Sequence, residues 1–300
     1  YVSNECVNAC IYCGFNVNNT MQRVTLSRED VLREAEALYC QGFRHILLVS
    51  GEDRSKVPVQ AFADIIRELS RSFAAVSIEV YPMEEDEYRL LADSGATGIA
   101  LYQETYDRNL YKQLHRGPKA DFDFRLASHD RAARAGFRDI GIGALLGLTD
   151  FRLDVACVAA HGAYLMKHFW KSQIAVSFPR LRHAAGDFTP PVTVTDKELA
   201  QVIFALRMVL PDADLVLSTR EAPDFRNGMA GLGITRMSAG SKTNPGGYSI
   251  SEGSLEQFEV ADSRSPAAIA AMLEDKNIEP VWKDFDPSFL FDHASTPQKQ

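Results

Sequence analysis

Three cysteines near the start of the chain are spaced for binding metal. Cys6, Cys10 and Cys13 lie within eight residues at CxxxCxxC spacing, in a stretch that predicts a loop. A structural zinc site takes four ligands, usually from two separated pairs, and the neighbouring turns offer no fourth cysteine or histidine. A cubane iron–sulfur cluster fits better, because three thiolates leave one iron open to a small molecule. Structural zinc or ordinary cysteines are the alternatives.

Further polar clusters follow the predicted strands at the points where apolar runs end. They are Ser50-Gly51-Glu52, Gln103-Glu104, Pro179-Arg180, Ser218-Thr219-Arg220 and Ser238-Ala239-Gly240-Ser241. A single cluster of this kind is also typical of a turn that caps a helix. Several clusters, each directly after a predicted strand, indicate a site at the carboxyl end of a parallel sheet. We therefore expect them to surround one mouth together with the cysteine loop.

The elements that position these clusters alternate between strand and helix. Continuous apolar runs such as His45–Val49 are typical of strands buried on both faces. The expected strands are 1–3, 45–49, 76–81, 97–102, 140–146, 173–178, 215–217 and 234–237. The expected helices begin at Ser27 and end by Gly42, then cover 58–72, 84–93, 122–135, 151–169, 196–210 and 225–232. Eight such units predict an α/β fold, a (β/α)8 barrel of the TIM type. A doubly wound sheet is the alternative, but its glycine-rich turn is missing.

The repeating pattern stops near Gly253. We expect residues 1–253 to form the barrel, and 254–300 to form a short C-terminal extension packed on it, with one helix at 266–275 and frayed final residues. The chain does not begin with Met, and Tyr1 lies five residues before Cys6. We therefore expect a further segment to precede Tyr1.

Composition limits the class of protein. The chain has 300 residues, of which 46% are hydrophobic, enough for a large core. Its 32 basic and 40 acidic residues give a net charge of −8, which argues against nucleic acid and membrane surfaces as partners. Cys40 and Cys157 fall in helical patterns and are expected to be buried. Five cysteines without a pairing pattern indicate a reducing compartment, so we expect a cytoplasmic protein.

The cysteine spacing, with Tyr12 directly before Cys13, resembles the signature of the radical S-adenosylmethionine (SAM) superfamily. In that superfamily three cysteines hold a 4Fe-4S cluster, and SAM binds its open iron. The resemblance implies that Cys6, Cys10 and Cys13 are the cluster ligands and that the cofactors are the cluster and S-adenosyl-L-methionine. Ser50-Gly51-Glu52 is similar to the Gly-Gly-Glu motif that holds the methionine amino group, with Ser50 in place of the first glycine.

The same resemblance implies further SAM contacts. Glu104 would bind the ribose hydroxyls, and Arg125 would pair with the SAM carboxylate, since a planar guanidinium suits a carboxylate. Tyr12 and the strand that contains Gly143 would bracket the adenine. The alternative interpretation of Arg125 is a surface arginine on a helix. The alternative for Gly143 is close packing of the backbone.

Longer segments resemble the aromatic amino acid lyase family, above all its tyrosine lyases of thiamine biosynthesis. They are Gly51-Glu52-Asp53, Tyr102-Gln103-Glu104-Thr105-Tyr106, Gly117-Pro118-Lys119, 143–148, 177–182, 218–221 and 238–243. This resemblance implies cleavage of the Cα–Cβ bond of L-tyrosine. The implied products are p-cresol and 2-iminoacetate (dehydroglycine), which supplies the thiazole of thiamine.

A carboxylate clamp for the amino acid is part of the same expectation. By analogy with the family, Arg220 would hold the carboxylate, with Ser238 and Tyr1 as hydrogen-bonding neighbours. Arg180 and Arg182 compete for that role or brace the mouth. The implied partners are L-tyrosine, a thiazole synthase that consumes the product, and a flavodoxin or ferredoxin as reductant.

Three alternative functions stay open at this point. A tryptophan lyase of antibiotic biosynthesis would carry the same motifs with a different ring pocket. The tyrosine lyase of hydrogenase maturation carries extra C-terminal cysteines, whereas this sequence has none after Cys157. A non-catalytic iron–sulfur scaffold would normally close its cluster with a fourth cysteine and would not need an arginine-lined mouth.

Overall fold

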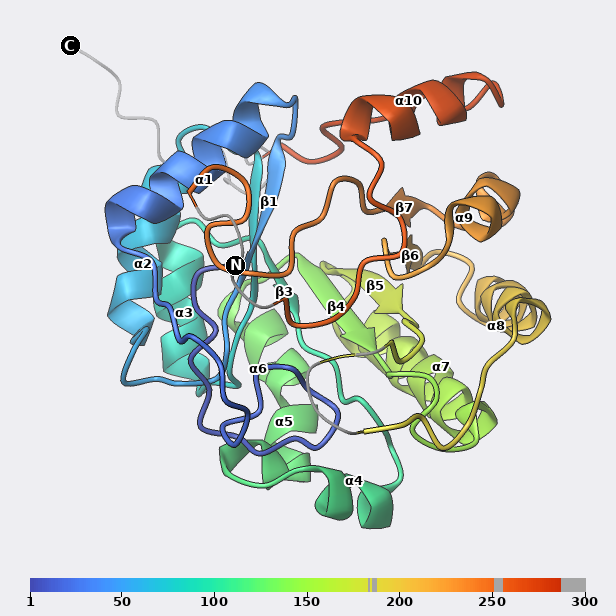
Figure 1. Cartoon of the computed structure of the whole chain (residues 1–300), viewed down its shortest axis with the longest axis horizontal. Coiled ribbons are helices and arrows are strands. Elements are labelled where there is room, and N and C mark those ends of the chain that lie inside the picture. The colour runs from blue at the N-terminus through green and yellow to red at the C-terminus, as the bar shows by residue number, and fades with distance from the viewer. Residues whose placement is uncertain (183, 185–187, 251–255, 287–300) are drawn as a thin grey trace.

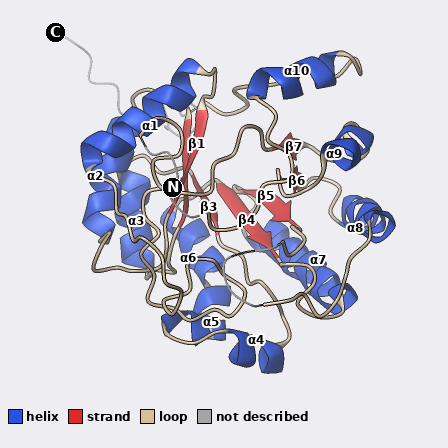
Figure 2. Ribbon diagram, viewed as in Figure 1, coloured by secondary structure: helices blue, strands red, loops and turns tan. Residues whose placement is uncertain are grey.

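Seven parallel strands form a single curled sheet at the centre of the molecule. The computed structural model describes residues 1–182, 184, 188–250 and 256–286. Within them the strand order follows the sequence from β1 to β7, and every neighbouring pair is parallel. Helices cover the outside of the curl (Figures 1 and 2). The sheet is a barrel-like α/β structure that is open between β1 and β7.

The elements alternate as the sequence predicts. The strands are β1 (His45–Val49), β2 (Ala75–Glu79), β3 (Gly98–Ala100), β4 (Asp139–Gly143), β5 (Gln173–Ser177), β6 (Asp214–Leu217) and β7 (Arg236–Met237). The α-helices are α1 (Arg28–Cys40), α2 (Val59–Leu69), α3 (Glu85–Asp93), α4 (Arg108–Leu114), α5 (Phe122–Leu126), α6 (Ser128–Ala135), α7 (Phe151–His168), α8 (Asp196–Val209), α9 (Pro223–Met229) and α10 (Pro266–Glu274).

The first of the eight expected strands, residues 1–3, is not part of the sheet. Ser3 makes only isolated bridges to Ser50 and Thr25. The amide of Val2 bonds the carbonyl of Val49 at 2.7 Å, so the chain pairs with the end of β1 through one parallel bridge only. The amide of Gly51 bonds the carbonyl of Ser3 at 2.8 Å, and a Cβ on Gly51 would lie 2.2 Å from the carbonyl oxygen of Glu5. Only glycine permits this close approach, which directs the chain into the cysteine loop.

Two local predictions also need correction. The expected helix at 122–135 is divided into α5 and α6 by a turn at Ala127. The segment expected to be a polar loop contains α4, because the side chain of Asp107 accepts the amides of Asn109 and Leu110 and so starts a helix. Cys40 is exposed rather than buried, at the end of α1.

The core lies between the sheet and the helices, while the inside of the curl is hollow. On β2, Val76 and Ile78 are fully buried in the main hydrophobic cluster. The alternate positions Ser77 and Glu79 line internal cavities. Because side chains of a strand point to opposite faces in turn, the apolar set packs under the helices and the polar set faces inward.

Ion pairs join the first residues of three strands at one end of the sheet. Arg236 of β7 bonds Asp139 of β4 at 2.6 Å and Asp214 of β6 at 2.7 Å. Trp282 packs edge-on against Phe43 beside β1, with the ring centroids 5.4 Å apart. The segment after α10 thereby covers part of the opening between β1 and β7.

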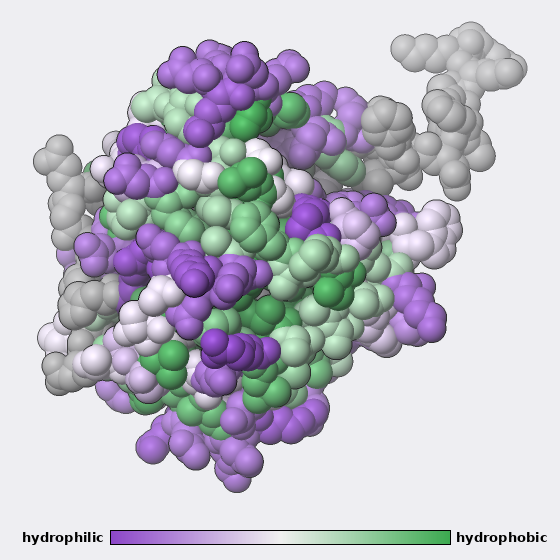
Figure 3. Space-filling view, turned by 90° about the vertical axis from the view of Figure 1, so that its right-hand side faces the viewer, coloured by the Kyte–Doolittle hydropathy of each residue, from purple (hydrophilic) through white to green (hydrophobic). Residues whose placement is uncertain are grey.

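The outer surface is of mixed polarity. The face that carries α8 and α9 alternates hydrophilic with hydrophobic patches (Figure 3). Among the described residues, no helix combines the length and the apolar character needed to cross a membrane.

Candidate active site

The polar clusters gather at the carboxyl ends of the strands, where the cysteine loop crosses them. The amide of Val7 bonds the carbonyl of Glu52, and the amide of Ala9 bonds the carbonyl of Arg116. Gly117 has φ +89°, and a Cβ there would lie 2.8 Å from the side-chain oxygen of Asn8. The loop is therefore held between the end of β1 and the segment after α4.

The three thiols lie near one another and near the ammonium group of Lys119. Burial raises the pKa of Cys10 to about 12 and also raises that of Cys13, while the nearby ammonium of Lys119 opposes both shifts. The backbone amide of Asn8 donates to Cys6 Sγ at 3.5 Å. Such N–H donors and a nearby cation are what a cluster thiolate needs once a metal has displaced its proton.

This donor set fits an iron–sulfur cluster better than a single ion. No group of three His, Cys, Asp or Glu side chains in the described part of the chain stands close enough to hold one metal ion. The three thiols nevertheless lie within electrostatic reach of one another. In a cubane each thiolate binds a different iron, so the sulfurs stand apart instead of converging on one point.

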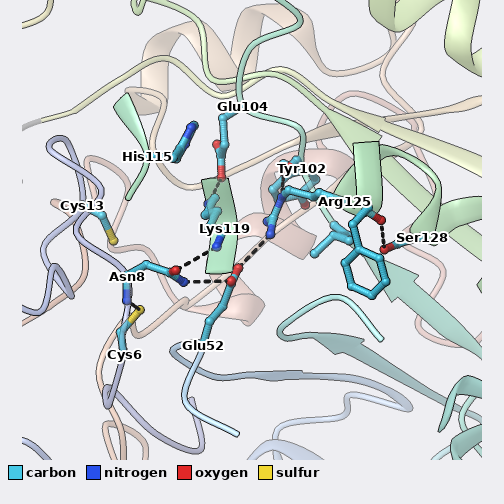
Figure 4. A network of polar contacts seen from close by, with 12 residues as sticks. Cys6, Asn8, Cys13, Glu52, Tyr102, Glu104, His115, Lys119, Arg125 and Ser128 are labelled. Atoms are coloured by element: carbon cyan, nitrogen blue, oxygen red, sulfur yellow. Dashed lines mark hydrogen bonds and ion pairs between the residues drawn. The ribbon is translucent and has the colours of Figure 1, made fainter. Parts of the chain in front are cut away.

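Beside the thiols, two ion pairs are buried in one network (Figure 4). Glu52 Oε1 accepts Arg125 Nη1 at 2.8 Å, and its Oε2 accepts the side-chain amide of Asn8 at 2.9 Å. Burial alone would raise the pKa of Glu52, but Arg125 and Lys119 hold it below its usual value. Arg125 is only 4% exposed, so the alternative of a surface arginine is wrong.

Glu104 and Lys119 form the second pair, at 2.8 Å. Burial would raise the pKa of Glu104, but the cations of Lys119 and Arg125 lower it overall. Glu104 is also one of two non-glycine residues with positive φ in the described chain, at +69°. Such a conformation costs energy and persists only when its surroundings fix it. Here it turns Glu104 toward Lys119 at the mouth.

Tyr12 stands at an apolar wall of the mouth. Its hydroxyl bonds the Nε2 of His115 at 2.7 Å, and it packs with Leu145, Leu148 and Phe188. Tyr12 is 8% exposed, so these neighbours cover most of its ring. At Gly143 a Cβ would lie 2.3 Å from the carbonyl oxygen of Ser177. Close packing of β4 against β5 therefore explains this glycine without a ligand.

Next to the cysteine loop, a cavity of about 410 Å³ opens into the curl. Tyr1, Arg220 and Ser238 all line it, as do apolar residues of β1 and β6. Arg220 lies over the ring of Phe258, 3.3 Å from its centroid, and no carboxylate among the described residues forms an ion pair with it. The Ser238 carbonyl bonds the buried Arg226, which itself pairs with Asp262.

The competing arginines are already engaged. Arg180 pairs with the buried Glu221 and with Asp196, and Arg182 lies 3.2 Å from the same glutamate. Because their charges are neutralised by protein carboxylates, these two brace the mouth. The guanidinium of Arg220 lies over the ring of Phe258 instead.

Two polar residues of the site make contacts that the sequence does not indicate. Lys119 was part of a recognised segment, but its ion pair depends on a contact with Glu104 from another loop. Gln257 accepts the hydroxyl of Tyr1 at 2.7 Å and donates to Cys13 Sγ at 3.8 Å. A glutamine in an irregular segment gives no sequence signal, because its partners are more than 240 positions away.

Two family descriptions match the chain. Residues 1–155 match the radical SAM superfamily, and residues 177–279 match the biotin and thiamin synthesis associated domain. The first match contains the cysteine loop, Glu52, Glu104 and Arg125. The second contains Arg220, Ser238 and Gln257.

Individual proteins are similar over most of the chain. The 2-iminoacetate synthases of Salmonella typhimurium and Escherichia coli are 43% and 44% identical over 288 residues, which is 95% of this chain and 76% of each relative. The crystal structure of HydG, a maturase of the FeFe-hydrogenase, superimposes with a TM-score of 0.89 at 34% identity. That superposition covers 97% of this chain and 67% of HydG.

A first prediction concerns the thiols. Replacement Cys10→Ala should abolish cluster binding, because the two remaining thiolates cannot hold three irons. Anaerobic reconstitution followed by iron analysis and visible absorbance measures this. The exposed Cys40→Ala is the matched control and should keep a full complement of iron. A Cys10→Ala protein that retains the cluster would remove this thiol from the ligand set.

A second prediction concerns the N–H···S contact. Replacement Gln257→Leu should lower the midpoint potential of the cluster, because a donor to a ligating sulfur stabilises the reduced, more negative form. A bond worth roughly 1 kcal/mol corresponds to a shift of about 40 mV for one electron. Redox titration followed by electron paramagnetic resonance measures it. The exposed Gln201→Leu on α8 is the control, and equal potentials in the two variants would contradict the prediction.

Proposed function

The chain belongs to the radical SAM superfamily, and we propose that it is the lyase that cleaves the Cα–Cβ bond of L-tyrosine to p-cresol and 2-iminoacetate. One observation carries this assignment. The identity to the two 2-iminoacetate synthases extends over 95% of the chain, and the cysteine loop lies within the residues that match the radical SAM superfamily. The similarity to HydG is lower, at 34% identity, and this difference favours the synthase over the hydrogenase maturase.

The residues that would hold the cofactors surround one half of the mouth. Cys6, Cys10 and Cys13 would bind the 4Fe-4S cluster. Ser50-Gly51-Glu52, Glu104 and Arg125 would hold SAM, with Tyr12 at its adenine. When bound, the cluster and SAM supply the radical chemistry that removes a hydrogen atom from the substrate. Among the described residues, Arg125 donates from Nε to the carbonyl of Tyr102 and from Nη1 to Glu52. Its other N–H groups are therefore available to a carboxylate.

The other half of the mouth would bind the amino acid. Arg220 would hold its carboxylate, with the hydroxyls of Ser238 and Tyr1 as neighbours. Apolar side chains of β1 and β6 line the same cavity and would exclude water from the aromatic ring. The volume of about 410 Å³ lies within the range of small-molecule pockets.

Several wider assignments accompany this function. We propose that residues 1–253 form the catalytic barrel and 254–300 an extension packed on it, although Gly253 and 287–300 lie outside the described residues. We also propose a thiazole synthase as the consumer of the product, a flavodoxin or ferredoxin as electron donor, and the cytoplasm as the location.

Product analysis tests the function directly. The reconstituted protein is given dithionite, SAM and either L-tyrosine or L-tryptophan, without oxygen, and the products are identified by mass spectrometry. We expect 5′-deoxyadenosine with p-cresol and glyoxylate, the hydrolysis product of 2-iminoacetate, from tyrosine alone. A cleaved indole would transfer the protein to the tryptophan lyases. A protein with an intact cluster that forms no 5′-deoxyadenosine would be a non-catalytic scaffold.

The carboxylate clamp yields a prediction of its own. Replacement Arg220→Lys should raise the KM for tyrosine roughly tenfold or more while the Kd for SAM stays within about twofold, because a point charge replaces a bidentate fork. The control is Arg182→Lys, whose charge faces Glu221 and whose KM for tyrosine should remain normal. A loss confined to SAM binding would place the clamp elsewhere.

A further inference from the structure

Glu79 is a carboxylate with no assigned task and no partner. It is the last residue of β2, and its side chain lines the same cavity as Tyr1 and Arg220. Among the described residues, no hydrogen bond and no ion pair reaches its carboxylate. Glu52, Glu104 and Glu221 pair with arginine or lysine, and Glu34, which lines the same cavity, accepts the amides of Tyr248 and Ser249.

An unpaired carboxylate in such a place is costly. Burial raises the pKa of Glu79 to about 7, and the negative charge of Glu104 adds to that effect. A cation that enters the cavity would stabilise the negative form of this carboxyl group. Nothing in the packing of β2 requires a charge, since the inward neighbour on the same strand is the uncharged Ser77.

The cavity is therefore lined by two groups of opposite charge, Glu79 and Arg220. Arg220, like Glu79, forms no ion pair within the described chain, and each acts on the charge of the other. The two do not neutralise each other by contact, and both line the same cavity. A ligand that carries a cation and an anion on adjacent atoms matches this pair, and the backbone of a free α-amino acid is such a group.

We propose that Glu79 binds the α-ammonium group of the amino acid substrate while Arg220 binds its carboxylate. This inference rests on the proposed function and adds a second anchor to it. Two anchors fix the Cα atom and the direction of the Cα–Cβ bond, whereas a carboxylate clamp alone leaves the amino acid free to rotate. Glu79 is thereby a positioning residue that contacts the substrate.

The test compares three ligands on the reconstituted, SAM-loaded protein without reductant, so that no turnover occurs. They are L-tyrosine, L-phenylalanine, which lacks the phenol hydroxyl, and 3-(4-hydroxyphenyl)propanoate, which lacks the ammonium. Calorimetry gives each Kd for the wild type, for Glu79→Gln, for Glu79→Asp and for the control Ser77→Ala. The Kd for SAM and the melting temperature establish that each variant is folded.

We expect Glu79→Gln to weaken tyrosine and phenylalanine equally, by roughly 10- to 100-fold, the worth of a hydrogen bond between charged groups. The propanoate should bind Glu79→Gln as well as it binds the wild type. Glu79→Asp, which keeps the charge, should recover part of the loss, and Ser77→Ala should change none of the three affinities.

Other results overturn the proposal in distinguishable ways. If Glu79→Gln weakens tyrosine and the propanoate but not phenylalanine, Glu79 binds the phenol and not the ammonium. If it weakens none of the ligands, Glu79 has no role in binding. Both results leave the proposed function intact. If the wild type itself binds neither tyrosine nor phenylalanine, the proposed function fails together with this inference.

Discussion

A charge that leaves water must find an opposite charge, and this requirement divides the mouth into two halves. On the side of the cysteine loop, Glu52 pairs with Arg125 and Glu104 pairs with Lys119, all largely buried. These pairs neutralise each other and hold their loops in place without a ligand. On the other side, Glu79 and Arg220 remain unpaired. The first half is therefore preorganised, whereas the second half is complete only when a zwitterion enters.

The hollow interior follows from how the strands distribute their side chains. The centre of a TIM barrel is usually filled with layers of branched apolar side chains. Here β2 turns Ser77 and Glu79 inward, and β4 turns Gly141 inward. These residues are too small or too polar to pack such a layer. The apolar alternate positions supply the stability under the helices, so the interior is free to serve as a binding cavity.

Features that depend on local chemistry could be predicted from the sequence, and features that depend on distant contacts could not. The thiol spacing, the polar clusters after the strands and the cap at Ser27 are local, and the structure has them where expected. The ion pair of Lys119 and the contacts of Gln257 join segments far apart in the chain. Glu79 is the instructive omission. The alternation of Ser77 and Glu79 along β2 indicates an inward polar face, whereas the polar clusters expected from the sequence all follow the ends of strands.

Residues 1–3 form no strand of the sheet, and Gln257 lies beside the cysteine loop, for the same reason. Between β1 and β7, the opening of the curl is covered by irregular segments from both parts of the chain. The amides of Tyr248 and Ser249 bond the carboxylate of Glu34 on α1, which anchors the loop after β7 across the opening (Figure 1). That loop brings Gln257 against Gly14, where a Cβ would lie 2.5 Å from the Gln257 carbonyl oxygen. This irregular closure lets Gln257 contact both Cys13 Sγ and the hydroxyl of Tyr1, a residue that lines the neighbouring cavity.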